Sequence, residues 1–232
     1  MKPRLAALLV ACAMGWAAPC PAASAPDAEA ASAFHILRDE GVAYHGGEAP
    51  LRPGSGWLAL DVVDGLWHLL PATLQGEQAF DDVLGDNTGV RIRATPAHAF
   101  LYLRLPGLVA GKVDTPDLRF KNNPRTVDDT TAIPLVFKGH AWRLDVVRHE
   151  LFLGNGETRM SLGRIASPSD EGVDPDSGLA LLWAGDLDRD GRLDLVFEGS
   201  DKNSGEVCVW LSSRATGGQL VGQAACWRTT GC

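Results

Sequence analysis

Short apolar runs separated by glycine-containing turns dominate this sequence, and no sustained helical period is present. The runs "GWLALDVV", "GLWHLLPA", "GVRIRAT" and "AFLYLRLPG" follow one another from Trp57 onward. In "WRLDVV", Leu144 and Val146 alternate with Arg143 and Asp145. Such alternation is typical of a strand with one face on a core and one in water. The pattern predicts a mainly β protein built from antiparallel, sandwich-like sheets.

Two tight hairpins are predicted near the middle of the chain. Lys138-Gly139 separates "IPLVF" from "HAWRLDVV", and Asn155-Gly156 lies between "HELFLG" and "ETRMSLG". Asn-Gly is the preferred pair for a two-residue hairpin turn. Residues 107–133 are polar and rich in turn formers, so we predict a long connection there. Only "AEAASAFHILRDEG", residues 28–41, favours a short helix.

The N-terminus has the pattern of a secretory signal. "MKPR" is basic, "LAALLVACAMGWAA" is apolar, and "PAASA" is a stretch of small residues suited to cleavage. The apolar run is short for a transmembrane span, and no later run is longer. We therefore expect residues 1–25 to be a signal peptide and the mature protein to be periplasmic or secreted. An alternative is a lipoprotein, because "LVAC" places Cys12 in a lipid-attachment box by letter.

Four regions follow from these patterns. Residues 1–25 are the predicted signal peptide, 26–56 a linker with a short helix, 57–165 an antiparallel β domain, and 166–232 a C-terminal β module. The last two are also compatible with a single packed domain.

The composition favours a soluble, acidic protein. The formal net charge is −8, and loss of Lys2 and Arg4 with the leader would leave about −10. Such a surface disfavours nucleic acid as a partner and is compatible with a metal cation.

Three cysteines remain after the leader: Cys208, Cys226 and Cys232. The runs around Cys208 and Cys226 resemble two strands joined by the turn "RATGGQ". If the turn is centred on Gly217, these two cysteines face each other, so a cross-strand disulfide is plausible. Pairing of Cys232 with either of them is the alternative.

The stretch "GDLDRDGRLDLVFEG", residues 185–199, concentrates negative charge. Asp186, Asp188, Asp190 and Asp194 would repel one another unless a cation lies among them. Counted from Asp186, their spacing matches the first nine positions of an EF-hand calcium loop, with glycine at the sixth position for a sharp reversal. The seventh position, Arg192, would contribute its backbone carbonyl.

The match to an EF-hand ends after these positions. Phe197 stands where an EF-hand has a bidentate glutamate, and the flanking runs are strand-like rather than helical. We therefore predict a strand–loop–strand calcium site with Asp194 as a direct ligand. A further oxygen would come from Glu198, Asp201 or the acidic segment 170–176.

Residues 179–212 resemble the calcium loops of FG-GAP and VCBS-type repeats, in which an Asp-x-Asp-x-Asp-Gly-x-x-Asp run joins two strands. Asp186, Asp188, Asp190 and Asp194 correspond to the ligands of that family. The resemblance implies Ca²⁺ binding in a cell-surface or secreted β protein. A propeller requires repeated blades, and this sequence has one copy of the motif.

These patterns lead to two functional hypotheses. The first is an exported, non-catalytic β protein that binds one structural calcium ion and acts in envelope or surface binding or in scaffolding, with a glycan or surface protein as partner. The alternative is a secreted hydrolase of glycan or peptide, with calcium as scaffold and residues 107–133 over a cleft. No nucleophile or acid–base pair is recognisable. The tryptophans of the mature chain lie in strand-like runs, which favours core positions over an exposed carbohydrate platform.

Overall fold

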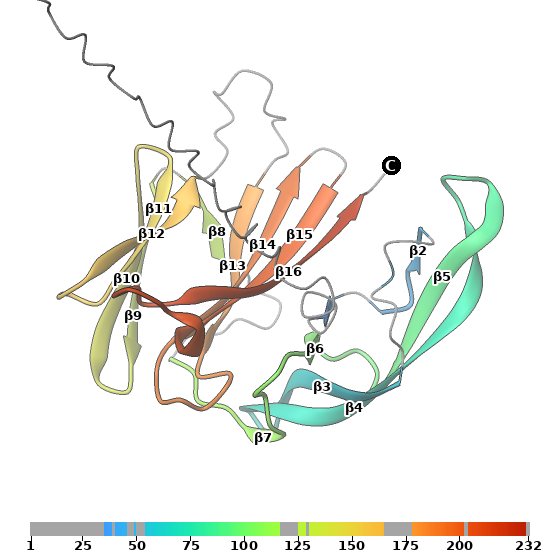
Figure 1. The fold of residues 1–232 in the computed structure, drawn as a ribbon, viewed down its shortest axis with the longest axis horizontal. Coiled ribbons are helices and arrows are strands. Elements are labelled where there is room, and N and C mark those ends of the chain that lie inside the picture. The colour runs from blue at the N-terminus through green and yellow to red at the C-terminus, as the bar shows by residue number, and fades with distance from the viewer. Residues whose placement is uncertain are drawn as a thin grey trace, which may run out of the picture.

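The computed structural model describes residues 35–38, 40–45, 49, 54–116, 125–128, 130–164, 178–201 and 204–230. The predicted signal peptide, Cys12, Cys232 and segment 170–176 lie outside these residues. The described chain forms three antiparallel sheets (Figure 1), which confirms the predicted mainly β, sandwich-like class. Within the described residues, no helix is both long enough and apolar enough to cross a membrane.

The first sheet has the order β1-β6-β3-β4-β5-β2, with β7 also paired to β4. Its strands are β1 (His35–Leu37), β2 (Ala43–Tyr44), β3 (Gly54–Val63), β4 (Leu66–Asp81), β5 (Asp86–Thr95), β6 (Leu101–Arg104) and β7 (Gly111–Lys112). Where a short helix was expected, His35–Leu37 forms a strand instead, because it pairs with Tyr102–Arg104 of β6. Ile36 and Leu37 are buried by this pairing.

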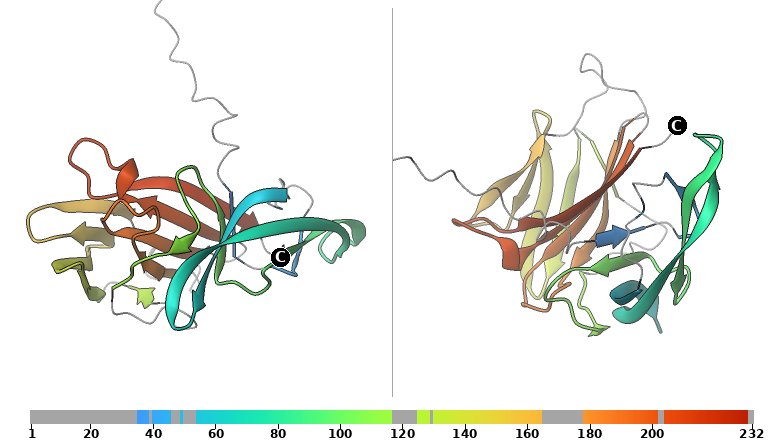
Figure 2. Two further views of the ribbon diagram at one scale, coloured as in Figure 1. Left: turned by 90° about the horizontal axis from the view of Figure 1, so that it is seen from below. Right: turned by 45° about the vertical axis from the view of Figure 1, so that its right-hand side comes forward.

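An arm extends from this sheet. β4 is 16 residues long; its first half pairs with β3, and from Thr73 onward it pairs with β5. Figures 1 and 2 show the two strands extending away from the other sheets. Phe80, Val83 and Leu84 are exposed at the arm's end. No strand was predicted for residues 75–85.

The second sheet contains both predicted hairpins, of which only the one at Lys138-Gly139 has a two-residue turn. The prediction of a two-residue turn at Asn155-Gly156 is wrong, because Gly154 pairs with Arg159 and residues 155–158 form the loop. Its order is β12-β11-β10-β9, formed by β9 (Ala132–Phe137), β10 (His140–Val147), β11 (Glu150–Gly154) and β12 (Arg159–Arg164). Lys138 and Gly139 have φ angles of 49° and 80°, the left-handed values that a tight hairpin turn requires. Leu144 and Val146 are buried while Arg143 is exposed, which confirms the predicted alternation.

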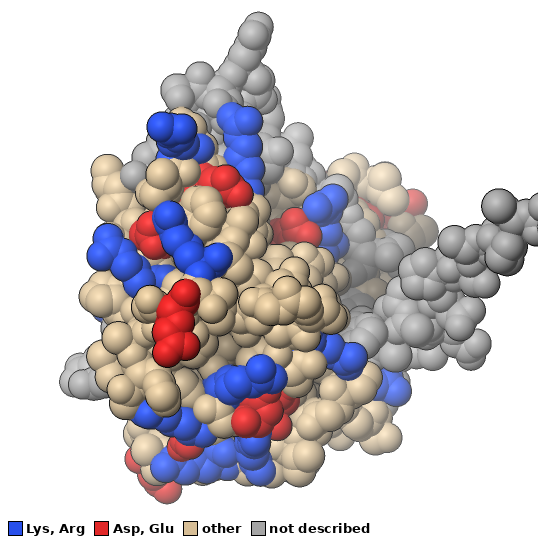
Figure 3. Space-filling view, turned by 60° about the vertical axis from the view of Figure 1, so that its left-hand side comes forward, with Lys and Arg blue, Asp and Glu red and all other residues tan. Residues whose placement is uncertain are grey.

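The outer side of the second sheet carries charges of both signs. Figure 3 shows this side of the molecule, with lysine and arginine side chains lying among acidic ones. Arg159 donates to Asp145 at 2.6 Å, and its guanidinium also lies 3.9 Å from the centre of the Phe152 ring. The basic groups are thus partly neutralised locally.

The third sheet has the order β16-β15-β14-β13-β8. Its elements are β8 (Arg125–Val127), β13 (Gly178–Gly185), β14 (Asp194–Asp201), β15 (Ser204–Leu211) and β16 (Gly222–Thr230), with the 3₁₀ turn η1 (Ser212–Arg214) after β15. β7, β8 and the start of β9 fall within residues 107–133, so the predicted long connection contains short strands.

One hydrophobic core joins all three sheets. It includes Leu60 of the first sheet, Leu144 of the second and Leu195 of the third, each with no exposed surface. Trp67 and Trp183 meet edge to face with ring centres 6.2 Å apart. Because Trp183 and Leu195 lie on the strands that flank the aspartate loop, the core holds both ends of that loop.

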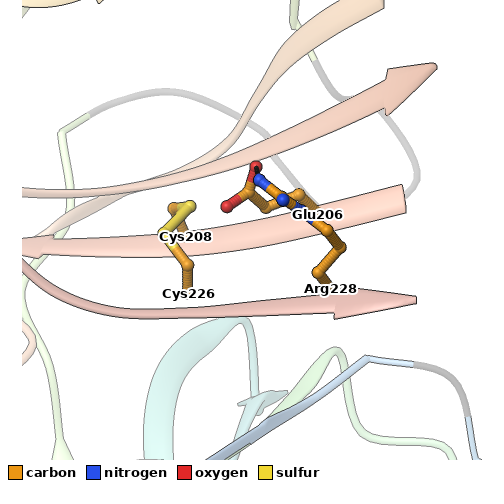
Figure 4. Close-up of a disulfide and its surroundings, with 4 residues drawn as sticks. All are labelled: Glu206, Cys208, Cys226 and Arg228. Atoms are coloured by element: carbon orange, nitrogen blue, oxygen red, sulfur yellow. Dashed lines mark hydrogen bonds and ion pairs between the residues drawn. A yellow bond between two sulfur atoms is a disulfide. The ribbon is translucent and has the colours of Figure 1, made fainter. Parts of the chain in front are cut away.

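A disulfide joins β15 to β16, as the sequence predicted. Cys208 and Cys226 are directly opposed across the two strands, with Cα atoms 4.1 Å apart. Next to them, Glu206 accepts from Arg228 at 3.0 Å (Figure 4). The Glu206 carboxylate lies near both sulfur atoms, but the disulfide removes the thiolates that a metal ion would need.

Candidate metal centre

The aspartate loop, residues 186–193, connects β13 to β14 at the edge of the core. The residue before the loop, Gly185, has to be a glycine. A Cβ at this position would lie 2.5 Å from the Asp114 carbonyl and equally close to the Trp183 ring. This close approach lets the Asp186 amide donate to the Asp114 carbonyl at 2.8 Å. Gly191, with φ +88°, provides the reversal expected at the sixth loop position. The backbone thus folds back on itself as predicted.

Three of the four aspartates come together. Asp186, Asp188 and Asp194 each contribute a carboxylate oxygen to a cluster whose members lie within 4.8 Å of one another. Asp186 and Asp194 are buried, with 3% and 0% of their surface exposed, and Asp188 is partly buried. This cluster could hold a metal ion.

Asp194 anchors the loop to the end of β15. Its Oδ2 accepts from the Leu187 amide at 2.6 Å, and its Oδ1 accepts from the Ser212 amide at 2.7 Å. Burial raises the pKa of Asp194 to about 7 and the charge of Asp188 adds to this, while the two amides act in the opposite direction. The balance of burial and neighbours therefore favours the neutral form of this carboxyl group.

Asp186 has one satisfied and one unsatisfied oxygen. Oδ2 accepts from Lys138 Nζ at 2.7 Å and from the Gly191 amide at 3.0 Å. Oδ1 is buried and has no hydrogen-bond partner within the part of the chain that the structure describes. A buried carboxylate oxygen without a donor is costly, and a bound cation would satisfy it.

The carboxylate of Asp190 is not part of this cluster and has other hydrogen-bond partners. Its carboxylate accepts from Arg192 Nε at 3.0 Å and Nη2 at 2.8 Å, and from Ser212 Oγ at 2.8 Å. Burial opposes its ionisation, but the bonds from Ser212 and Arg192 outweigh burial and lower its pKa. The Arg192 amide donates to Asp190 at 2.9 Å, so both residues belong to one closed turn. Asp188, by contrast, accepts from the hydroxyl of Ser213 and stays with the cluster.

The further oxygen donors named from the sequence are not brought to the cluster among the described residues. Glu198 accepts from Arg38 at 2.9 Å, and Asp201 ends β14 while Asp194 begins it. Three neighbours of the site carry no local sequence signal for metal binding. Lys138 lies in a predicted turn, Asp114 in the predicted connection 107–133, and Ser212 just before the predicted turn "RATGGQ".

The donor set defines the kind of ion that would fit. All three clustered side chains offer carboxylate oxygens, which suit hard divalent cations such as Ca²⁺, Mg²⁺ and Mn²⁺ rather than thiolate-preferring metals. A second observation fits the same kind of ion: Asp186 Oδ1 is buried and has no hydrogen-bond partner among the described residues. The described residues therefore fit a hard cation.

The tryptophans contribute mainly to packing. Trp57, Trp67 and Trp183 are buried, and Trp142, Trp210 and Trp227 are half-buried. The first sheet also has a cavity of about 670 Å³ beside Trp57, Thr73 and Leu105. The described residues that line it include no histidine or carboxylate, so they supply no acid–base pair.

Comparisons with protein-family models, with curated proteins and with solved structures found no match to this chain. The class that the fold and the site define is a mainly β protein with a disulfide and an acidic cluster able to hold a metal ion.

Proposed function

We propose that this chain is an exported, non-catalytic β protein in which the aspartate loop binds one structural calcium ion. The observation that carries the proposal is Asp186 Oδ1, a buried carboxylate oxygen that has no donor among the described residues and lies beside two further carboxylates. Asp186, Asp188 and Asp194 would form the core of the site. Asp190 and the Arg192 carbonyl remain proposed ligands, and Asp190 would have to leave Arg192 to reach the ion.

Calcium fits this loop better than magnesium. Ca²⁺ accepts six to eight oxygens in irregular geometry, whereas Mg²⁺ requires a nearly ideal octahedron and retains water. The three carboxylates come from one short segment of the chain. Such a donor set does not have the regular arrangement of an octahedron. The resemblance of residues 179–212 to FG-GAP and VCBS-type calcium loops supports the same ion.

The ion would act as a structural pin. Its charge would offset the mutual repulsion of three carboxylates, and Asp194 would transmit the restraint to Ser212, which follows β15. The disulfide is compatible with an extracellular location. Sites in extracellular modules bind Ca²⁺ with dissociation constants on the order of 10⁻⁴ to 10⁻³ M. Stabilised in this way, the protein would serve in envelope or surface binding or in scaffolding, with a glycan or surface protein as partner.

The proposal is tested by thermal melts of the mature protein in excess calcium and in chelator. We expect calcium to raise the melting temperature by several degrees, because it binds the folded state alone. Asp188→Asn should remove most of this rise and change the melt in chelator little. Asp82→Asn, an exposed aspartate on the arm, is the matched control and should keep the full rise. Equal melts with and without calcium in the wild-type protein would overturn the proposal.

A further inference from the structure

Lys138 places a side-chain cation against the metal-binding cluster. Its Nζ lies 2.7 Å from Asp186 Oδ2 and 3.5 Å from Asp114 Oδ2. Asp186 lies 48 positions further along the chain, in the loop between β13 and β14 of the third sheet, whereas Lys138 lies between β9 and β10 of the second sheet. The ammonium therefore joins the β9–β10 turn to the aspartate loop.

The turn positions this ammonium. Lys138 and Gly139 both adopt left-handed backbone conformations between two paired strands. The ammonium also lies 5.3 Å from the centre of the Phe137 ring. The 2.7 Å contact with the Asp186 carboxylate is an ion pair. The cluster thus has a positively charged neighbour from another part of the chain.

One oxygen of Asp186 is occupied by Lys138 and the other has no partner among the described residues. A divalent ion bound to this carboxylate would lie only a few ångströms from the ammonium, where like charges repel strongly. We propose that Lys138 is a tethered counter-ion that competes with calcium for Asp186 and sets the affinity of the site. Calcium binding then weakens the contact between the β9–β10 turn and the loop.

This inference rests on the proposed calcium function of the loop, and it adds a residue that tunes the site. Two of the four aspartates already have a cationic partner in this chain: the ammonium of Lys138 partly compensates Asp186, while Arg192 compensates Asp190. The remaining carboxylates of the cluster are then those of Asp188 and Asp194.

Lys112 is a matched control on the same side of the site. Its Nζ lies 3.9 Å from Asp114 Oδ1, and its side chain is 55% exposed. Lys112→Gln changes the net charge by the same amount as Lys138→Gln. The ion pair that it removes is with Asp114 rather than with Asp186. The two variants therefore separate a local effect at Asp186 from a general charge effect.

The experiment is calorimetric titration of Ca²⁺ into the wild-type protein, Lys138→Gln, Lys112→Gln and Lys138→Arg. Removal of a unit charge at this distance should tighten calcium binding about tenfold in Lys138→Gln. Lys112→Gln should change it less than about twofold because solvent screens the exposed charge. Lys138→Arg should bind like the wild type. In chelator, Lys138→Gln should melt no higher than the wild type.

The outcomes distinguish this inference from the proposed function. If the wild type binds calcium and Lys138→Gln binds it equally or more weakly, the inference is wrong and the proposed function stands. If only Lys138→Gln binds, Lys138 closes the site and the proposed function of the native chain is wrong. If neither protein binds, both are wrong.

Discussion

Asp81 and Asp194 are both buried aspartates whose carboxylates accept backbone hydrogen bonds, yet their surroundings differ in charge. Asp81, at the end of the β4–β5 arm, accepts from His45 Nδ1 at 2.7 Å and from the Val83 amide at 2.9 Å. Asp194, the first residue of β14 after the aspartate loop, accepts from the Leu187 and Ser212 amides and lies beside Asp188. One carboxylate faces an imidazole and the other faces a second carboxylate.

The pKa values differ in direction as a result. Burial opposes ionisation of Asp81, but hydrogen bonds from His45, Leu84 and Val83 outweigh burial and lower its pKa. At Asp194 burial prevails, Asp188 adds to it, and the pKa rises to about 7. The neighbours of a buried carboxylate, rather than burial alone, decide whether it completes a turn or needs a cation.

The largest expected effect is the loss of stability in Asp194→Ala. This change leaves the amides of Leu187 and Ser212 buried without an acceptor, at about 2 kcal/mol each. We therefore expect the free energy of unfolding to fall by about 4 kcal/mol in calcium-free buffer, measured by urea denaturation. Asp81→Ala should cost less, because the arm end is open to water and the freed amides can hydrate. An equal loss in both variants would contradict the comparison.

The second prediction concerns pH in the absence of calcium. Because the pKa of Asp194 is raised to about 7 in the folded state and is about 3.9 when unfolded, the folded protein holds a proton that the unfolded chain has lost. This group's contribution to stability is therefore greatest at low pH and declines as pH rises toward 7, by at most about 1.4 kcal/mol per unit. Asp81 has a lowered pKa, so its contribution is present above about pH 4 and is lost as pH falls through its folded value.

Urea denaturation across this pH range, in calcium-depleted buffer, measures the effect. Asp194→Asn, which does not titrate, should remove the decline between about pH 4 and 7. Because calcium requires an ionised carboxylate, the stabilisation by calcium should grow over the same range. A wild-type protein and an Asp194→Asn variant with identical pH profiles would show that Asp194 is ionised throughout.

The smallest expected effect is that of His45→Ala on the arm. The substitution removes the side-chain donor to Asp81 while leaving the Val83 and Leu84 amides in place. We expect faster hydrogen exchange at those two amides and no measurable change at Leu187 and Ser212. Faster exchange in the aspartate loop as well would mean that the two regions are coupled.

Local patterns predicted much of this structure. The two-residue turn at Lys138-Gly139 and the pairing of Cys208 with Cys226 follow from spacing within short segments. The hairpin at Asn155-Gly156 was located in the same way, but its loop spans residues 155–158 and is longer than predicted. The reversal of the aspartate loop at Gly191 was visible for the same reason.

Features that depend on distant partners could not be predicted in this way. The outer half of β4 lacks apolar alternation because both of its faces are largely exposed, and β1 is a strand only because β6 pairs with it. The ammonium of Lys138 reaches Asp186 across 48 residues, a contact that no local pattern encodes. The separation of Asp190 from the other three aspartates likewise depends on Ser212, which follows β15.

The most direct test of the calcium site is the stoichiometry of Ca²⁺ binding to the mature protein, measured by equilibrium dialysis near pH 8. We expect one ion per chain in the wild type and none in Asp186→Asn, which removes the charge beside the buried Oδ1 and keeps the backbone bond to Asp114. Asp190→Asn should weaken binding less, because Asp190 is paired with Arg192. Absence of calcium binding in the wild type, or equal binding in Asp186→Asn, would contradict the account.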